Sequence, residues 1–405
     1  MRAIQRMSIL IACALAPVIA IAFGSKPGYA LLAIPAALAV ARRSGAGSAV
    51  ALVAGSGAAL ALYAGALRLS GLDERIYYRF QERFSTWSAR LGHRAFVPNI
   101  SYRQRELHGD LQLFTSEPIA EPRDVLFRSD SEGFRNDADY AGEPWVLLGD
   151  SFVVGVGVSQ ENVLQARLAP RGIRAYNLAH PGDLLDYEVY WRSFTARHGH
   201  TSRVVLFLFE GNDFPGEGRA RLRPPWRIAI DEGTRDLTAP LTRLATYRVT
   251  RALTANLAAR VEHNGHEEAQ VFSLAGARVA FYTPYMRQAR AIAIEGMAPT
   301  DAAFARLAPD LAAVFFIPTK FRVYQPWLVP EERLPNASWQ HLARLCEEYS
   351  VSCTDLTPAL IRRSEALLAS GRFTWWRDDT HWNDAGIEAA AEVVADVLHA
   401  LGPQP

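Results

Sequence analysis

Five short apolar runs between residues 144 and 357 restrict the fold of this chain more than any other feature. Runs of this length, apolar on both faces, are typical of strands in a parallel sheet that is covered by helices. The stretches between the runs have helical periodicity, and the alternation of strand and helix predicts an α/β domain over residues 141–405. The runs are PWVLLGDS, IRAYNLAHPG, RVVLFLFEGND, AAVFFIPTK and VSCTDLT.

A second feature is the uncharged apolar sequence near the N-terminus, in stretches over 7–24, 29–41 and 44–67. Their lengths suit membrane-spanning helices, and the arginines at positions 2, 6, 42 and 43 mark cytoplasmic ends. We therefore expect a transmembrane anchor of about three helices over 1–70, with the remainder outside the cytoplasm, on the periplasmic or extracellular side. A cleaved signal peptide followed by a buried apolar hairpin is the alternative.

Two further segments have less regular patterns. Residues 71–140 are polar and aromatic, and we interpret them as a juxtamembrane helix and an irregular lead-in. Residues 214–305 interrupt the strand–helix alternation and are expected to be an insertion at the carboxyl end of the third strand, where open α/β sheets bind ligands. Alternatively, this insertion is a surface segment that has no functional role.

Charge and cysteine content exclude some functions. Lys and Arg number 43 against 42 Asp and Glu, a net charge of +1 that does not favour a nucleic-acid partner. Cys346 and Cys353 could form a disulfide in an oxidising compartment, or they could be two buried free thiols. No histidines converge on them, so we expect no metal site, and no motif indicates a cofactor.

The block VLLGDSFVVGVGV contains the candidate nucleophile, Ser151. A strand that ends in Gly149-Asp150-Ser151 delivers the hydroxyl to the carboxyl edge of the sheet, near a helix N-terminus. The tripeptide by itself is a weak signal, because it also occurs by chance.

The block TWWRDDTHWNDAG contains the candidate base, His381. Asp378 precedes it by three residues, so one tight loop could place this carboxylate against one imidazole nitrogen and leave the other nitrogen for the serine. Asp379 is a rival for the orienting role. The alternative for the whole block is a helix N-terminus with a capping aspartate and a solvated histidine.

Two smaller blocks follow the second and third apolar runs. Gly182, in NLAHPGD, could contribute a backbone N–H to an oxyanion hole, and Asn212, in EGND, could contribute its side-chain amide. Each block alone is commonly just a turn. Their shared position after successive strands favours one site.

These blocks together resemble the SGNH (GDSL-like) hydrolase superfamily, which carries Ser, Gly, Asn and His in this chain order; Ser151, Gly182, Asn212 and His381 match it. The resemblance covers about residues 125–400. It implies a flavodoxin-like three-layer α/β/α fold with a parallel sheet, an oxyanion hole completed by Gly182 and Asn212, and Asp378 supporting His381. The block AHPGD departs from the usual small-residue turn of the family, which makes Gly182 the least secure match.

Three other segments, FRSDSEGFRN, FFIPTKFRVYQP and DDTHWN, resemble the membrane-tethered branch that includes alginate O-acetyltransferase-like proteins. This resemblance implies action on exported polysaccharides. Trp375, Trp376 and Trp382 beside the candidate base would suit stacking on a sugar ring, or they could form a loop that packs on the core.

We therefore expect a serine esterase or O-acyltransferase that forms an acyl-Ser151 intermediate and adds O-acyl groups to an exported polysaccharide or removes them. The expected partners are an acylated carbohydrate or other ester substrate, the membrane, and polysaccharide-export or acyl-donor proteins. The alternative is a non-catalytic carbohydrate-binding or scaffold protein on the same fold.

Overall fold

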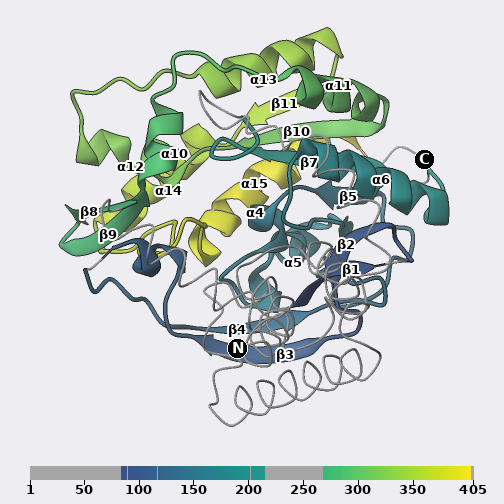
Figure 1. Ribbon diagram of the computed structural model, residues 1–405, viewed down its shortest axis with the longest axis horizontal. Coiled ribbons are helices and arrows are strands. Elements are labelled where there is room, and N and C mark those ends of the chain that lie inside the picture. The colour runs from purple at the N-terminus through teal and green to yellow at the C-terminus, as the bar shows by residue number, and fades with distance from the viewer. Residues whose placement is uncertain (1–83, 89, 116, 201, 215–267, 403–405) are drawn as a thin grey trace, which may run out of the picture. The chain divides into compact units, whose positions relative to one another are not determined.

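The computed structural model describes residues 84–88, 90–115, 117–200, 202–214 and 268–402 (Figure 1). The chain divides into two compact units, and the second, Leu91–Arg221 with His263–Pro405, contains nearly all the described residues. The expected membrane spans over 1–70 lie outside the described residues. Among the described helices, none combines the length and the apolar character needed to cross a bilayer.

A parallel sheet of five strands forms the centre of the second unit, in the order β11-β10-β7-β5-β6. In chain order this is 2-1-3-4-5, the order of flavodoxin-like sheets. The strands are nearly fully buried in the middle of the sheet because both faces are covered. The predicted α/β class and parallel sheet are confirmed. The strands are β5 (Trp145–Leu148), β6 (Ala175–Asn177), β7 (Arg203–Phe209), β10 (Leu311–Ile317) and β11 (Ser352–Asp355).

Helices cover the two faces of this sheet (Figure 1). On one face, α6, α11 and α13 share a buried apolar cluster with side chains of β5, β7 and β10. On the other, α15 contacts β10 and lies against α5 and α14, and α12 contacts α14. The helices are α4 (Ser151–Val154), α5 (Leu164–Leu168), α6 (Leu184–His198), α10 (Thr283–Ala289), α11 (Ala298–Leu307), α12 (Lys320–Leu328), α13 (Ala337–Glu348), α14 (Thr357–Leu368) and α15 (Asp384–Leu401).

An antiparallel pair precedes the sheet, formed by β3 (Ser101–Glu106) and β4 (Arg123–Arg128). Burial alternates along β4, so that Arg123, Val125 and Phe127 face inward. The irregular lead-in expected over 71–140 is therefore wrong for this part. The expected juxtamembrane helix falls mainly on residues outside the described ranges.

The remaining described elements are short. They are β1 (Ser85–Ser88), β2 (His93–Phe96), β8 (Ala269–Leu274), β9 (Ala277–Tyr282), and the 3-10 turns Asp110–Phe114, Gln160–Asn162, Ala169–Arg171 and Ala308–Asp310. Strands β8 and β9 form an antiparallel hairpin. The expected insertion over 214–305 includes this hairpin, but it also includes most of α11, a helix of the domain's own covering layer. Residues 215–267 of this insertion lie outside the described ranges.

A disulfide joins Cys346, near the end of α13, to Cys353 in β11. The Cα atoms are 6.1 Å apart. Of the two interpretations of these cysteines, the structure adopts the disulfide, which ties edge strand β11 to the helix that precedes it.

Candidate active site

Ser151 stands where the chain turns from β5 into α4. Asp150 caps this short helix, and its carboxylate accepts a hydrogen bond from the backbone N–H of Phe152 at 2.8 Å. A side chain at Gly149 would meet a methyl group of Val153 at 2.7 Å, so the turn requires glycine there. The Oγ atom of Ser151 lies 2.7 Å from Nε2 of His381, although 230 positions separate the two residues.

His381 belongs to a tight hairpin between α14 and α15. Trp375 and Trp382 pair across this hairpin, and the N–H of Trp376 donates to the carbonyl of His381 at 3.3 Å. Directly opposed residues of an antiparallel pair share one face. Trp376 and His381 therefore share one face of the hairpin, and Trp375 and Trp382 share the other.

Asp379, not Asp378, orients the imidazole of His381. Oδ1 of Asp379 lies 2.7 Å from Nδ1 of His381 and also accepts the backbone N–H of His381 at 3.0 Å. An aspartate readily folds back onto the N–H two residues later, and this turn brings Asp379 to the ring. The expectation for Asp378 is wrong, because its carboxylate points away and accepts the N–H groups of Gly109 and Glu121, each at 2.7 Å.

Arg123, from the start of β4, binds both of these aspartates. Its guanidinium donates to Asp379 at 2.7 Å, to Asp378 at 3.0 Å and to Glu106 at 2.9 Å. It also stacks on the ring of Trp376, 4.7 Å from the centroid. Burial disfavours its charge, but the three carboxylates outweigh this effect and raise the pKa of Arg123. Burial raises the pKa of Glu106 to about 7, against the influence of the guanidinium.

Lys320, the first residue of α12, supports the same hairpin through its backbone. Its ammonium donates to the carbonyls of Ala280 and Trp376, both at 2.7 Å, of Arg377 at 3.0 Å and of Asp379 at 3.2 Å. Burial lowers the pKa of Lys320 to about 7, although the nearby carboxylates oppose this shift. One buried cation thus holds the hairpin against β9.

Asp110 completes the surroundings of the candidate base. It accepts the N–H and the hydroxyl of Thr380, at 2.8 and 2.7 Å. Oxygen and nitrogen atoms of Asp110, Asp379 and His381 all lie within 4.8 Å of one another, so these three could in principle hold a metal ion. The guanidinium of Arg123 already binds Asp379 and would repel a cation. We therefore assign the cluster to hydrogen bonding.

The two expected oxyanion-hole residues lie on loops that follow β6 and β7. The side-chain amide of Asn212 is 3.4 Å from Oδ2 of Asp150, which places it beside the residue that precedes Ser151. Gly182 lies just before α6, and its carbonyl accepts a hydrogen bond from the hydroxyl of Tyr187 at 3.1 Å. Ser151 is the first residue of α4, so its own N–H has no acceptor within the helix.

Two of the three expected sugar-stacking tryptophans are core residues. Trp375 and Trp382 are 0% exposed, and their indole N–H groups donate to the carbonyls of Thr380 and Phe152, at 3.1 and 3.2 Å. The stacking role expected for these two is wrong, and the interpretation as a packed loop holds for them. Trp376 is only partly buried and lines a pocket of about 280 Å³. The other lining residues are Glu121, Gly371, Arg372, Phe373, Arg377, Asn383, Asp384 and Ala385.

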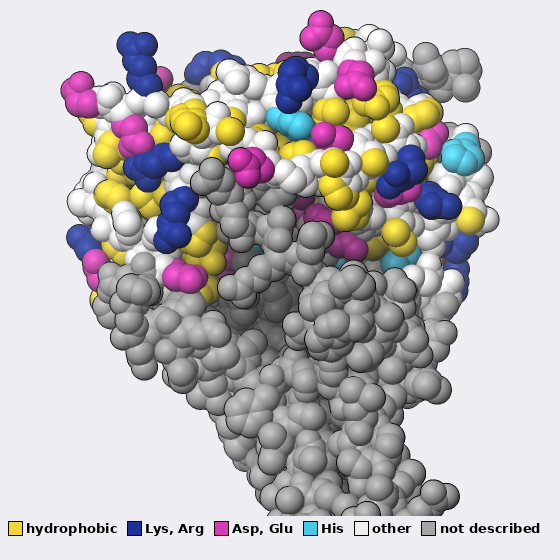
Figure 2. Space-filling model, turned by 45° about the horizontal axis from the view of Figure 1, so that its top comes forward, with side chains coloured by type: hydrophobic (Ala, Val, Ile, Leu, Met, Phe, Trp, Pro, Cys, Tyr) yellow, Lys and Arg dark blue, Asp and Glu magenta, His cyan; other side chains and the backbone are white. Residues whose placement is uncertain are grey.

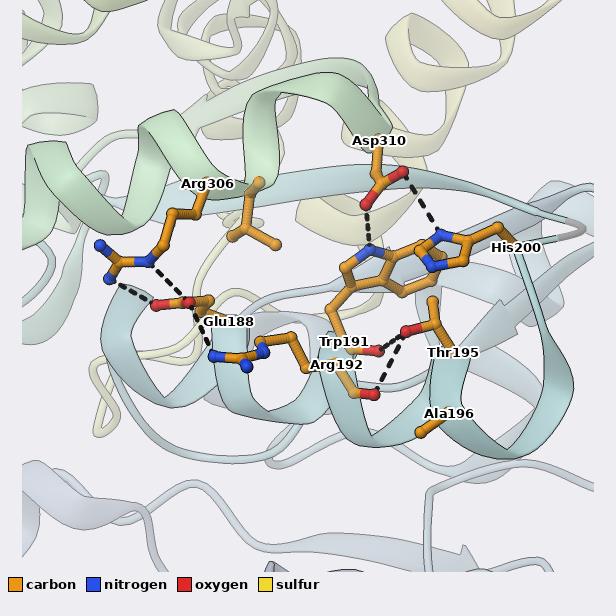
Figure 3. A pocket seen from close by; sticks show the side chains of 9 residues that line it. Glu188, Trp191, Arg192, Thr195, Ala196, His200, Arg306 and Asp310 are labelled. Atoms are coloured by element: carbon orange, nitrogen blue, oxygen red, sulfur yellow. Dashed lines mark hydrogen bonds and ion pairs between the residues drawn. The ribbon is translucent and has the colours of Figure 1, made fainter.

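Another pocket, of about 480 Å³, lies between α6 and α11 and contains none of the expected site residues (Figure 3). Its charged groups are already paired. Glu188 accepts two hydrogen bonds from Arg306, at 2.7 and 2.6 Å, and Asp310 accepts the indole N–H of Trp191 at 2.7 Å. Over the described part of the face drawn in Figure 2, basic and acidic side chains are interspersed.

Three residues around the hairpin were not expected from the sequence: Arg123, Lys320 and Asp110. For Arg123 a signal exists, because the alternation in RDVLFR puts an arginine on the apolar face of a strand, where a charge requires a partner. Lys320 comes three residues after a buried strand and is a comparable signal. Asp110 lies in a short turn with no such pattern.

The parallel sheet and the hydrogen-bonded Ser, His and Asp define an α/β domain of the serine-hydrolase type. Residues 282–405 match the family model described as SGNH hydrolase-like domain, acetyltransferase AlgX. This match confirms the resemblance to the SGNH superfamily and to its AlgX-like branch. No curated protein and no solved structure matches the chain significantly.

Proposed function

We propose that this protein is a serine acyl-ester enzyme that works through an acyl-Ser151 intermediate. The observation that carries the proposal is the continuous contact from Ser151 through His381 to Asp379, with 2.7 Å at each step. Such a chain lets the imidazole take the serine proton while the carboxylate stabilises the imidazolium that forms.

In the first half-reaction, the Ser151 oxygen attacks the ester carbonyl as its proton moves to Nε2 of His381. The tetrahedral intermediate expels the alcohol, which receives that proton, and the acyl group stays on Ser151. In the second half, water or a sugar hydroxyl attacks the acyl group and gives its proton to His381. The bond between the acyl group and Ser151 then breaks, and the serine oxygen takes that proton back. The developing oxyanion would accept hydrogen bonds from the N–H groups of Ser151 and Gly182 and from the amide of Asn212.

We further propose that the acceptor is a polysaccharide hydroxyl and that the acyl group is acetyl. The match to the AlgX-like domain supports this substrate class. Trp376 shares the hairpin face of His381 and lines the 280 Å³ pocket together with Arg372, whose side chain is exposed. An aromatic surface beside charged groups suits one sugar ring.

The proposed location is outside the cytoplasm, with the apolar segments over 1–70 as the membrane anchor. The disulfide between Cys346 and Cys353 supports an oxidising compartment. An anchored transferase would act on a polysaccharide as it leaves the membrane, next to export or acyl-donor proteins.

The test is to incubate the purified protein with p-nitrophenyl acetate, with and without oligosaccharide acceptors. We expect slow release of acetate alone, faster turnover with an acceptor, and an acetylated sugar as product. A fluorophosphonate should label wild type and not Ser151→Ala. Ser151→Ala and His381→Ala should each lower turnover by several orders of magnitude, and the double variant by little more. Absence of both labelling and turnover, with oligosaccharide binding intact, would identify a non-catalytic binding protein.

A further inference from the structure

The guanidinium of Arg123 makes specific contacts with the candidate site. It uses Nε for Glu106, one terminal nitrogen for Asp378 and the other for Asp379. The Trp376 ring lies against its flat face. Its side chain is 5% exposed, so water contributes little to its solvation and these contacts fix its orientation.

The two oxygens of Asp379 have different partners. Oδ1 binds the imidazole of His381, whereas Oδ2 accepts hydrogen bonds from Arg123 at 2.7 Å and from the backbone N–H of Asp110 at 3.3 Å. The orientation of the carboxylate is therefore set from the side opposite His381. Lys320, the other buried cation here, donates only to backbone carbonyls, including that of Asp379.

The cluster is rich in negative charge. The groups that face Asp379 and His381 from the surrounding elements are Glu106 from β3, Asp110 from its 3-10 turn, Arg123 from β4, Lys320 from α12, and Asp378 from the hairpin itself. Without Arg123, the carboxylates of Asp378 and Asp379 would lie next to each other in a buried site without a directly bound cation, and this arrangement is strongly unfavourable.

We propose that Arg123 is a positioning residue for the catalytic pair: it holds Asp379 in line with His381 and balances the charge of the two adjacent aspartates. The proposal rests on the proposed function. It makes the β3–β4 pair part of the catalytic unit, although this pair precedes the α/β domain expected over 141–405. The unit that carries the activity therefore includes residues 101–128.

The experiment compares Arg123→Gln and Arg123→Lys in the full chain. Removing the charge leaves His381 in a more negative surrounding, which favours its protonated form, and protonated His381 cannot accept the serine proton. The acid limb of the fluorophosphonate labelling rate should then move up by about one to two pH units, the size of a charge interaction over roughly 8 Å at an effective dielectric near 20. In Arg123→Lys, the acid limb of the labelling rate should return most of the way to its wild-type pH. The maximal rate should stay lower, because lysine lacks the planar fork of the guanidinium.

Arg197→Gln is the matched control. Arg197 also forms a two-pronged ion pair, with Glu132 at 3.0 and 2.9 Å, but Arg197 lies on α6, away from the hairpin. Arg197→Gln should keep the wild-type maximal labelling rate and the wild-type position of the acid limb. If the fluorophosphonate labels wild type, and its labelling rate falls by the same factor at every pH in Arg123→Gln, Arg123 has only a structural role. If Arg123→Gln does not fold, an unshifted limb and an unchanged plateau in Arg123→Lys overturn the inference. Failure of wild type to label refutes the proposed function instead.

Discussion

Replacing Lys320 by Met should change how the stability of this protein depends on pH. The ammonium of Lys320 is buried, with 5% of the residue exposed, and donates to four backbone carbonyls of the hairpin and β9. Its pKa is lowered to about 7 by burial. In the unfolded chain a lysine titrates near about 10.4. Met has a similar length and no charge, so the substitution removes the titration with little change in volume.

The sign follows from proton binding. Between about pH 7 and 10.4 the unfolded chain holds a proton on Lys320 that the folded chain has lost, so the free energy of unfolding rises with pH. The slope is about 1.4 kcal/mol per pH unit, which gives about 3 kcal/mol between pH 7 and pH 9.5. Below about pH 7 the contribution is constant.

Urea unfolding followed by tryptophan fluorescence, at half-unit steps from pH 6 to pH 9.5, measures this directly. The relevant quantity is the difference in unfolding free energy between wild type and Lys320→Met, in which other titrating groups cancel. Glu106, whose pKa burial raises to about 7, is present in both proteins. The difference should be flat below pH 7 and grow in favour of wild type above it. Parallel curves over the whole range would refute the assignment of a depressed lysine pKa.

Three further outcomes are expected. Asp379→Asn should lower kcat/KM by about 10³- to 10⁴-fold with a small change in Tm. Asp378→Asn should chiefly lower stability, by about 3 kcal/mol. Ester hydrolysis and thermal melts measure both effects, and a larger loss of activity in Asp378→Asn than in Asp379→Asn would contradict us. Cys346 and Cys353 should resist alkylation until reduced, and Cys353→Ser should cost about 2 kcal/mol in a melt; immediate labelling of both thiols would argue against the disulfide. A reporter that is active only outside the cytoplasm, fused after residue 405, should be active, and cytoplasmic activity would count against the proposed location.

Local pattern was sufficient to predict the sheet and two members of the candidate site, Ser151 and His381. The apolar runs identified the strands, and Ser151 was identified at the end of the first run, because parallel strands bring their carboxyl ends to one edge. His381 was identified from its own block, TWWRDDTHWNDAG. These features depend on residues that are close in sequence. The match to an SGNH domain model covers residues 282–405, which include His381 but not Ser151.

The choice between Asp378 and Asp379 could not be made in this way. Adjacent residues in a tight turn point in different directions, and which one faces the imidazole depends on partners more than 250 positions away, among them Gly109 and Arg123. The tryptophans were misjudged for a related reason. Cross-strand pairing in the hairpin buries Trp375 and leaves Trp376 partly exposed, and sequence proximity to His381 does not reveal that alternation.

The hydrogen bond between Gly109 and Asp378 joins residues that are 269 positions apart, so it cannot form in the nascent chain until both have been synthesised. At a synthesis rate of about 5–20 residues per second, the segment around Gly109 waits roughly ten to fifty seconds for its partner. Until then, the hairpin that presents His381 does not exist. Closing so long a loop comes late in folding, because its entropic cost is recovered only when the intervening sheet is in place. The contact between Ser151 and His381 therefore forms late, after both ends of the domain have met.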